Sequence, residues 1–457
     1  MQQTKDESVL RQLMTLAWPI VLAFMMQTSY NLVDLFWVGK LGATSIAAVS
    51  LAGNFFYIIL ALGQVIGSGT VALVAHSYGA RLFGRANTVA KQSILLAFAT
   101  AFIIGTLAFL FSGQIMSFLG GRDAVLDLST DYLRIVSIGF FFQLLSFSIN
   151  YIFRGAGDMK IPMLIMLIAT VLNLVLDPLL ILGIGFFPRL EVGGAAIATT
   201  IAKFISFCVG IVILVRGRSG LKLETSRPWN VQWTVAKKIF SIGIPVGISY
   251  GLMAASIMAI FGIVAGFSEH ALAALGIGTR IFQFASLPVV GIGVATTTLV
   301  GQRLGARNAR GAAMAGNTAL RLSSAIMFLF IVLFIAGARN LMGLFTQSAQ
   351  TVGYGVQFMH IVAFYLIFVG ISTTLTGVYR GAGYTTPPMV AGVIKVTILY
   401  ALALLVARAM HMGVTGVWWS MLAAYGVESI VLIIWYRRGT WRAKGLALMK
   451  GMPAVDR

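Results

Sequence analysis

Long apolar runs separated by short polar segments dominate this chain. Twelve runs are each long enough to cross a bilayer as a helix, which needs about 20 residues. The predicted spans lie near 14–38, 46–75, 92–112, 132–152, 161–183, 193–215, 237–265, 273–300, 319–338, 355–378, 389–409 and 414–436. The longest polar interruption, 216–236, gathers charge, proline and two tryptophans, which is typical of a linker. We therefore expect an all-α polytopic membrane protein with two six-helix lobes, residues 1–220 and 221–457.

Composition supports a membrane protein and argues against the soluble classes. Hydrophobic residues make up 59% of the chain and charged residues only 10%, too few to cover a soluble surface. The net charge of +20 could suggest nucleic acid, but the basic residues are scattered through short loops. The polar N-terminal segment also lacks the compact apolar region and small-residue site of a cleavable signal. A lipid bilayer, not nucleic acid, is the expected environment.

The distribution of basic residues orients the predicted helices. With both termini in the cytoplasm, inner segments hold 24 of the 33 lysines and arginines, whereas outer loops hold five. This bias follows the positive-inside rule. Six spans per half give both halves the same orientation, as in parallel repeats related by an axis along the membrane normal. We expect the two lobes to form a V around a central cavity.

An internal repeat with one constant offset indicates a duplication. The repeat pairs Pro19 with Pro245, residues 79–81 with 305–307, and residues 154–157 with 380–383. Shared glycines and basic residues at the inner ends of helices are typical of turns and caps, so we interpret them as scaffold.

Polar residues that the repeat does not share are more informative about function. Asp34, Asn173 and Asp177 face Ile260, Leu399 and Ala403 at the same offset. Carboxylates inside a membrane are costly and usually mark an ion or proton path, although each could instead satisfy a nearby backbone donor. Tyr30 and Asn31 share a helix face with Asp34, and Thr199 lies in a run of small residues that favours close helix packing. The predicted site therefore comprises Tyr30, Asn31, Asp34, Asn173, Asp177 and Thr199. Oxygen ligands suit H⁺ or Na⁺, and two nearby carboxylates can share a proton.

Two prolines are predicted hinges near this site. Pro19 lies in the same helix as Asp34 and removes one backbone hydrogen bond, so the helix can bend there. Pro178 directly follows Asp177 and disfavours regular helix at that residue, which could free carbonyl oxygens to face a ligand.

The second half offers a possible polar site of its own, made of Arg280, Lys395 and Glu428. Cations in these spans would suit a flippase for anionic lipid-linked oligosaccharides. Snorkelling, or pairing of Lys395 with Glu428, is the structural alternative. Glu428 has only the Tyr425 hydroxyl as a polar neighbour on its own helix, so we expect it to matter less than Asp34.

A third function, intramembrane aspartyl proteolysis, is suggested by Gly155-Ala156-Gly157-Asp158. The second copy keeps the glycines but has Tyr384 in place of Asp158, as expected of a turn. Asp158 also lies at the predicted inner rim, away from the membrane centre. We therefore expect no enzyme.

The paired motifs RGAGD…LDPLL and YRGAG…PPM, with YNLVDLFWVGKLG, HSYGAR and GQRLGAR, resemble the multidrug and toxin extrusion (MATE) family. The resemblance spans both halves and is closest to the DinF-like branch of bacteria and archaea. It implies export of small amphipathic, often cationic drugs in exchange for H⁺ or Na⁺, without a cofactor, by a plasma-membrane protein that we expect to be a monomer. It places the cation site, including any Na⁺, at Asp34, Asn173, Asp177 and Thr199. Another branch has an acidic residue where this chain has Met253, which argues against a second ion site in the C-terminal lobe.

Overall fold

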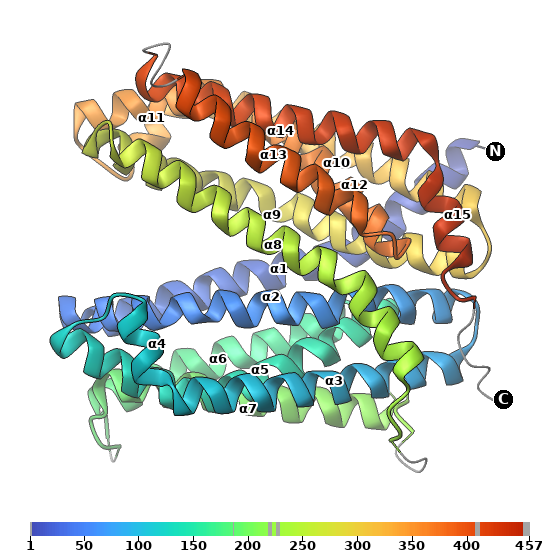
Figure 1. Ribbon diagram of the computed structural model, residues 1–457, viewed down its shortest axis with the longest axis horizontal. Coiled ribbons are helices and arrows are strands. Elements are labelled where there is room, and N and C mark those ends of the chain that lie inside the picture. The colour runs from blue at the N-terminus through green and yellow to red at the C-terminus, as the bar shows by residue number, and fades with distance from the viewer. Residues whose placement is uncertain (1, 186, 218–221, 225–228, 407–411, 451–457) are drawn as a thin grey trace. The chain divides into compact units, whose positions relative to one another are not determined.

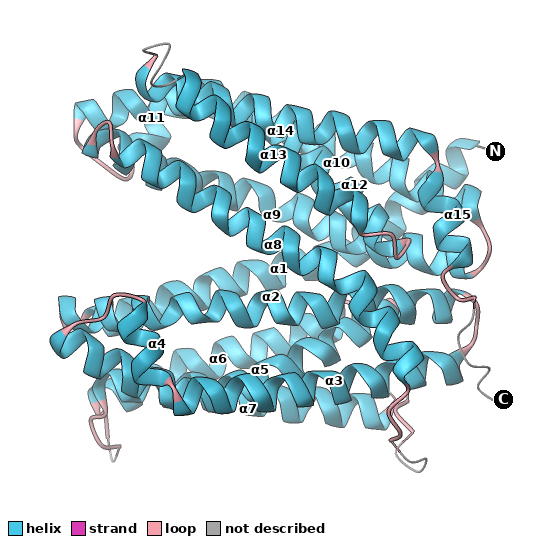
Figure 2. Ribbon diagram, in the orientation of Figure 1, coloured by secondary structure: helices cyan, strands magenta, loops and turns pink. Residues whose placement is uncertain are grey.

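The computed structural model describes residues 2–185, 187–217, 222–224, 229–406 and 412–450, with side chains from residue 8 onward. Within these ranges every element of regular structure is helical (Figures 1 and 2). The helices are α1 Gln2–Gly39, α2 Ala43–Gly79, α3 Phe83–Leu110, α4 Ser112–Phe118, α5 Asp123–Ala156, α6 Lys160–Leu182, α7 Glu191–Arg216, α8 Trp233–Ala265, α9 Glu269–Gly305, α10 Ala309–Gly343, α11 Ala349–Val362, α12 Tyr365–Gly381, α13 Thr386–Leu404, α14 Gly413–Arg438 and α15 Thr440–Ala447.

The helices confirm the predicted number of membrane spans. Among the described residues, eleven helices are long and apolar enough to cross a membrane. The pair α11 and α12 supplies a twelfth span, bent by 52° at the break between the two helices. The sequence predicted one span there, near 355–378, and neither Ala363 nor Phe364 at the break is a proline or glycine that would explain the bend.

Several helices extend beyond the predicted apolar runs. The first begins at Gln2 rather than near residue 14, because Val9 and Leu13 are fully or almost fully buried in an apolar cluster with residues of α9 and α12. A helix can therefore extend beyond its apolar run, into a polar segment, when one of its faces packs against other helices.

The expectation that Pro178 disfavours helix at Asp177 is wrong. Helix α6 is continuous through Asp177 and ends at Leu182, with Gly183 in a left-handed C-cap at φ 71°. A proline removes only one backbone hydrogen bond, which a helix can lose without ending. The carboxylate of Asp177 is therefore held by a regular helix.

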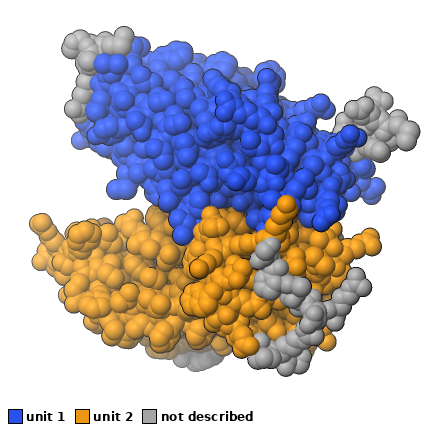
Figure 3. All heavy atoms as spheres, turned by 45° about the vertical axis from the view of Figure 1, so that its right-hand side comes forward, with its two compact units in different colours: residues 1–18, 244–448 blue, residues 19–243, 449–457 orange. Residues whose placement is uncertain are grey.

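The chain divides into two compact units, coloured separately in Figure 3. The N-terminal unit comprises Pro19–Gly243 with Met449–Arg457, and the C-terminal unit comprises Ile244–Leu448 with Met1–Trp18. Helices α1 and α8 thus each contribute to both units, and each changes unit at or next to its proline, Pro19 or Pro245. The predicted lobe boundary at 220/221 lies outside the described residues, and the V-shaped arrangement stays a prediction.

Equivalent glycine contacts recur in both units. Gly155 of α5 packs against Val71 and Val74 of α2, and Gly381 of α12 packs against Thr297 and Val300 of α9. All three positions are related by the constant offset of the repeat, so the duplicated motif preserves a close approach of two helices.

The glycine-rich turns also have the predicted cap geometry. Gly157 is left-handed at φ 93° and Gly383 at φ 67°, a conformation that favours glycine. The Asp158 carboxylate accepts hydrogen bonds from the backbone amides of Lys160 at 3.0 Å and Ile161 at 3.1 Å. Asp158 therefore caps the start of α6, which accounts for its place in the motif without proteolysis.

Candidate functional site

Three helices of the N-terminal unit each bring two polar side chains to the same buried region. The pairs are Tyr30 and Asp34 on α1, Asn173 and Asp177 on α6, and Thr199 and Lys203 on α7. Each pair is four residues apart and so lies on one face of its helix.

Contacts between α1 and α7 join the first and third pairs. The Tyr30 hydroxyl lies 3.0 Å from Thr199 Oγ1 in a hydrogen bond. Lys203 Nζ lies over the Tyr30 ring, 4.9 Å from its centroid, in a cation–π contact. The charge of Lys203 also interacts with that of Asp34. The Tyr30 side chain is therefore fixed by contacts at its hydroxyl and at its ring, and Asp34 lies one helical turn further along α1.

Helix α6 supplies the most deeply buried part of the site. Asn173 is 1% exposed and Asp177 is fully buried. Asn173 Nδ2 donates a hydrogen bond of 2.8 Å to Asp177 Oδ1, which orients both groups. Asp177 interacts electrostatically with Asp34 of α1. Tyr132 of α5 interacts electrostatically with both carboxylates.

Several oxygens in this site lack a partner. Among the described residues, Asp34 Oδ1, Asn173 Oδ1 and Asp177 Oδ2 are buried and accept no hydrogen bond. Buried acceptors are normally paired, because leaving one unpaired costs about 1–3 kcal/mol and more for a charged group. A set of unpaired carboxylate and amide oxygens can bind a proton or a hard cation.

The structure separates one predicted residue from the site and adds two that the prediction missed. Asn31 is exposed, and its Oδ1 accepts a hydrogen bond from Gln27 Nε2 at 3.2 Å, so it lies apart from the carboxylates. Lys203 and Tyr132 belong to the cluster but were not predicted. A signal for Lys203 was present, because it lies four residues after Thr199 on the same helix face. No comparable pattern marks Tyr132.

The possible polar site of the C-terminal unit is an ion pair. Lys395 Nζ of α13 lies 3.0 Å from Glu428 Oε1 of α14, and both side chains are about nine-tenths buried. Lys395 also lies over the Tyr425 ring at 4.5 Å, and Ser372 hydrogen-bonds to Glu428. Arg280 of α9 is exposed and has no ion pair among the described residues. The structure therefore joins Lys395 with Glu428 and leaves Arg280 outside.

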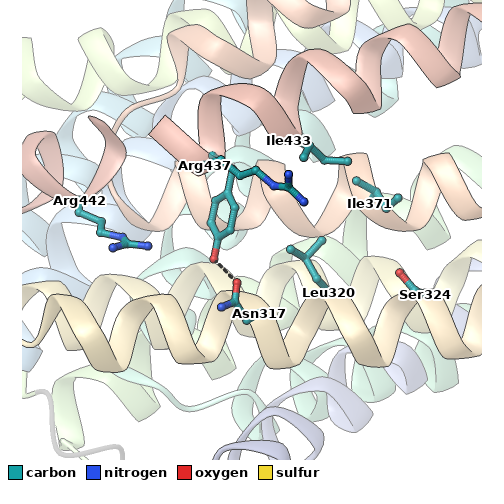
Figure 4. A pocket seen from close by; sticks show the side chains of 8 residues that line it. Asn317, Leu320, Ser324, Ile371, Ile433, Arg437 and Arg442 are labelled. Carbon is teal, nitrogen blue, oxygen red and sulfur yellow. Dashed lines mark hydrogen bonds between the residues drawn. The ribbon is translucent and has the colours of Figure 1, made fainter. Parts of the chain in front are cut away.

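A pocket of about 510 Å³ lies in the C-terminal unit (Figure 4). Its wall includes Arg437 and Arg442, and the Tyr436 hydroxyl donates a hydrogen bond of 2.8 Å to Asn317 Oδ1 across it. No acidic residue lines this pocket, so it lacks the chemistry expected of a cation site.

Comparison with known proteins places these features in a family. The sequence model of the MatE family matches residues 19–179 and again residues 245–405. The two matches begin and end at the offset of the internal repeat, which confirms the predicted duplication. The chain is 25% identical to the probable multidrug resistance protein YoeA of Bacillus subtilis over 447 residues, covering 97% of this chain and 96% of that protein.

Two further similarities extend over nearly the whole chain. The multidrug export protein MepA of Staphylococcus aureus is 25% identical over 452 residues, with 97% of each chain covered. A solved outward-facing multidrug resistance MATE family transporter of the MOP superfamily superposes with a TM-score of 0.86, at 25% identity and 97% coverage of each chain. With both halves matched by the family model, this chain belongs to the MatE family and is a multi-pass membrane transporter rather than an enzyme.

Proposed function

We propose that this transporter exports small amphipathic, mainly cationic compounds in exchange for H⁺ or Na⁺. The observation that carries the proposal is the buried carboxylate pair of Asp34 and Asp177, with three unpaired oxygens in the N-terminal unit. An inward-moving ion and an outward-moving organic cation can both neutralise these carboxylates. Relatives named as multidrug resistance and multidrug export proteins support the substrate class.

Coupling requires that the ion bind the two access states with different affinity. A hundredfold preference for one state biases the conformational equilibrium by about 2.7 kcal/mol. The carboxylates supply such a preference, because a charge in a water-poor site is far more costly than a neutralised one. On this proposal, Asp34 and Asp177 are ionised when the drug is bound and neutral after it has left.

Pro19 is the proposed flex point of the cycle. It lies in the helix of Asp34, fifteen residues earlier, where α1 changes from one compact unit to the other. Pro245 occupies the equivalent place in α8. A missing backbone hydrogen bond in each crossing helix lowers the cost of bending there. We keep Pro178 as a secondary hinge at the end of α6.

The remaining parts of the proposal concern location and assembly. The bias of basic residues supports cytoplasmic termini in a bacterial or archaeal plasma membrane. The coupling ion is the only cofactor-like species required, and a single chain contains both units, so we propose a monomer. The flippase alternative is less well supported, because Glu428 neutralises Lys395 and leaves no buried excess of positive charge in that pair.

The proposal is tested with purified protein in proteoliposomes loaded with a fluorescent organic cation. An imposed pH gradient alone, or a sodium gradient alone, should drive substrate movement against its concentration gradient. Collapse of the effective gradient with an ionophore should stop it. Equal substrate movement with and without any ion gradient would show a passive pathway and reject the proposed exchange.

A further inference from the structure

Lys203 places a positive charge in the middle of a membrane-spanning helix. It lies twelve residues after Glu191 and thirteen before Arg216, so about 18 Å of helix separates it from either end of α7. That distance is too long for a lysine side chain to snorkel to the membrane surface. The residue is also only 8% exposed. Its charge must therefore be compensated inside the N-terminal unit.

The side chain is directed toward Tyr30 of α1. In an α-helix, side chains lean toward the N-terminus, which for Lys203 is the direction of Thr199. The position of Lys203 Nζ over the Tyr30 ring agrees with this direction, because the Tyr30 hydroxyl is bonded to Thr199. The compensating charge is that of Asp34, one turn after Tyr30.

The charged and titratable groups of this cluster other than Lys203 are acidic or aromatic. They are Tyr30 and Asp34 from α1, Tyr132 from α5 and Asp177 from α6. Lys203 interacts with Asp34, and Asp34 interacts with Asp177, so one built-in ammonium group belongs to a cluster with two carboxylates. The ammonium has three donors, and the unpaired oxygens of Asp34, Asn173 and Asp177 are the acceptors in the same cluster.

A sodium ion bound at Asp34 would be repelled by the charge of Lys203, which already interacts with that carboxylate. Two unit charges about 5 Å apart, at an effective dielectric constant of about 20, repel enough to weaken binding roughly a hundredfold. Lysine's compact charge and flexible stem also let it occupy the place of a small cation. A proton avoids this competition because it neutralises one carboxylate oxygen covalently.

We propose that Lys203 is a built-in cation that excludes sodium from the Asp34–Asp177 site and thereby makes the proton the coupling ion. The choice of coupling ion rests on the function proposed above, whereas the exclusion of sodium is a binding property that can be measured without transport. On this proposal, the Na⁺ predicted at Asp34, Asn173 and Asp177 does not fit the site, because the prediction left out the positive charge of Lys203.

The binding test compares thermal unfolding of detergent-purified protein in sodium chloride and choline chloride at equal ionic strength. Wild type and Lys203→Arg, which keep the positive charge, should have the same Tm in both salts. Lys203→Met keeps the side-chain volume but removes the charge. Its Tm should rise by about 5 °C or more in sodium chloride once the sodium concentration reaches about a hundred times the Kd of the variant for sodium. Adding Asp177→Asn to Lys203→Met should abolish the gain.

Lys395→Met is the matched control, because it also removes a buried lysine beside a carboxylate. It leaves only Glu428, without a second carboxylate or an amide, and should show no sodium-dependent shift. Lys203→Gln serves as the second neutral variant if Lys203→Met does not fold. A sodium shift in wild type that Asp34→Asn removes, or no sodium shift in a folded neutral variant, would overturn the proposal.

Transport measurements distinguish a failure of this inference from a failure of the proposed exchange, on which the choice of coupling ion rests. In proteoliposomes, wild-type efflux should follow the pH gradient and ignore sodium, and the neutral Lys203 variant should become several-fold faster with an inward sodium gradient. If no gradient drives wild-type efflux, the proposed exchange fails, and the unfolding data still decide whether Lys203 excludes sodium. Sodium-driven efflux by wild type would contradict the role of Lys203 directly.

Discussion

Breaking the Lys395–Glu428 ion pair should destabilise the C-terminal unit far more than it impairs coupling. The two charged atoms lie 3.0 Å apart and both side chains are about nine-tenths buried. At an effective dielectric constant of about 20, their attraction is about 5 kcal/mol, and most of it offsets the cost of burying two charges. Glu428→Gln removes the attraction but leaves the Lys395 charge buried, so we expect a loss of about 3–5 kcal/mol.

The double variant tests whether Lys395 and Glu428 stabilise the unit as a pair or independently of each other. Lys395→Met with Glu428→Gln leaves no buried charge, and it should recover most of the stability lost by either single change. The measurement is thermal unfolding in detergent, in which each single variant should lower Tm by about 10 °C. Transport per folded molecule should stay substantial in Glu428→Gln. Additive losses would refute the ion-pair reasoning, and complete loss of transport with normal folding would place the coupling site in the C-terminal unit.

Three further predictions address the N-terminal unit. Asp34→Asn and Asp177→Asn should each abolish gradient-driven efflux, and the double variant should be no worse than either, because the carboxylates act together. Residual reconstituted efflux in a single variant that the double variant lowers further would contradict this. Pro19→Ala restores one backbone hydrogen bond and should slow turnover several-fold while substrate binding, measured by equilibrium fluorescence, stays nearly unchanged. Gly157→Ala forces a side chain into the left-handed conformation at φ 93° and should cost about 1–2 kcal/mol in thermal unfolding, whereas an unchanged Tm would argue against strain at this turn.

Sequence patterns predicted the architecture well because each span is set by a long apolar run. The twelve spans and the duplication at one constant offset both followed from local features. Helix ends were less predictable, because residues such as Val9 and Leu13 become helical through packing with distant segments. The bend between α11 and α12 has no local signal. The DinF-like branch stays a prediction.

The candidate site was predicted only in part, since spacing identifies a shared face but not a contact between helices. Asp34, Asn173, Asp177, Tyr30 and Thr199 lie in one cluster, whereas Asn31 shares a face with Asp34 without joining it. Lys203 was not part of the predicted site, and its significance depends on contacts between α7 and α1. Lys395 and Glu428 are on different helices, so their pairing was only one of the alternatives before the structure.

The central claim is that drug export and ion entry depend on the same carboxylate pair. The most direct measurement records ion movement caused by the drug itself, in proteoliposomes with a pH-sensitive dye and no imposed gradient. Adding the organic cation to one side should move protons to that side in wild type, and folded Asp34→Asn protein should give no such movement. Proton movement of normal size in Asp34→Asn would contradict the claim.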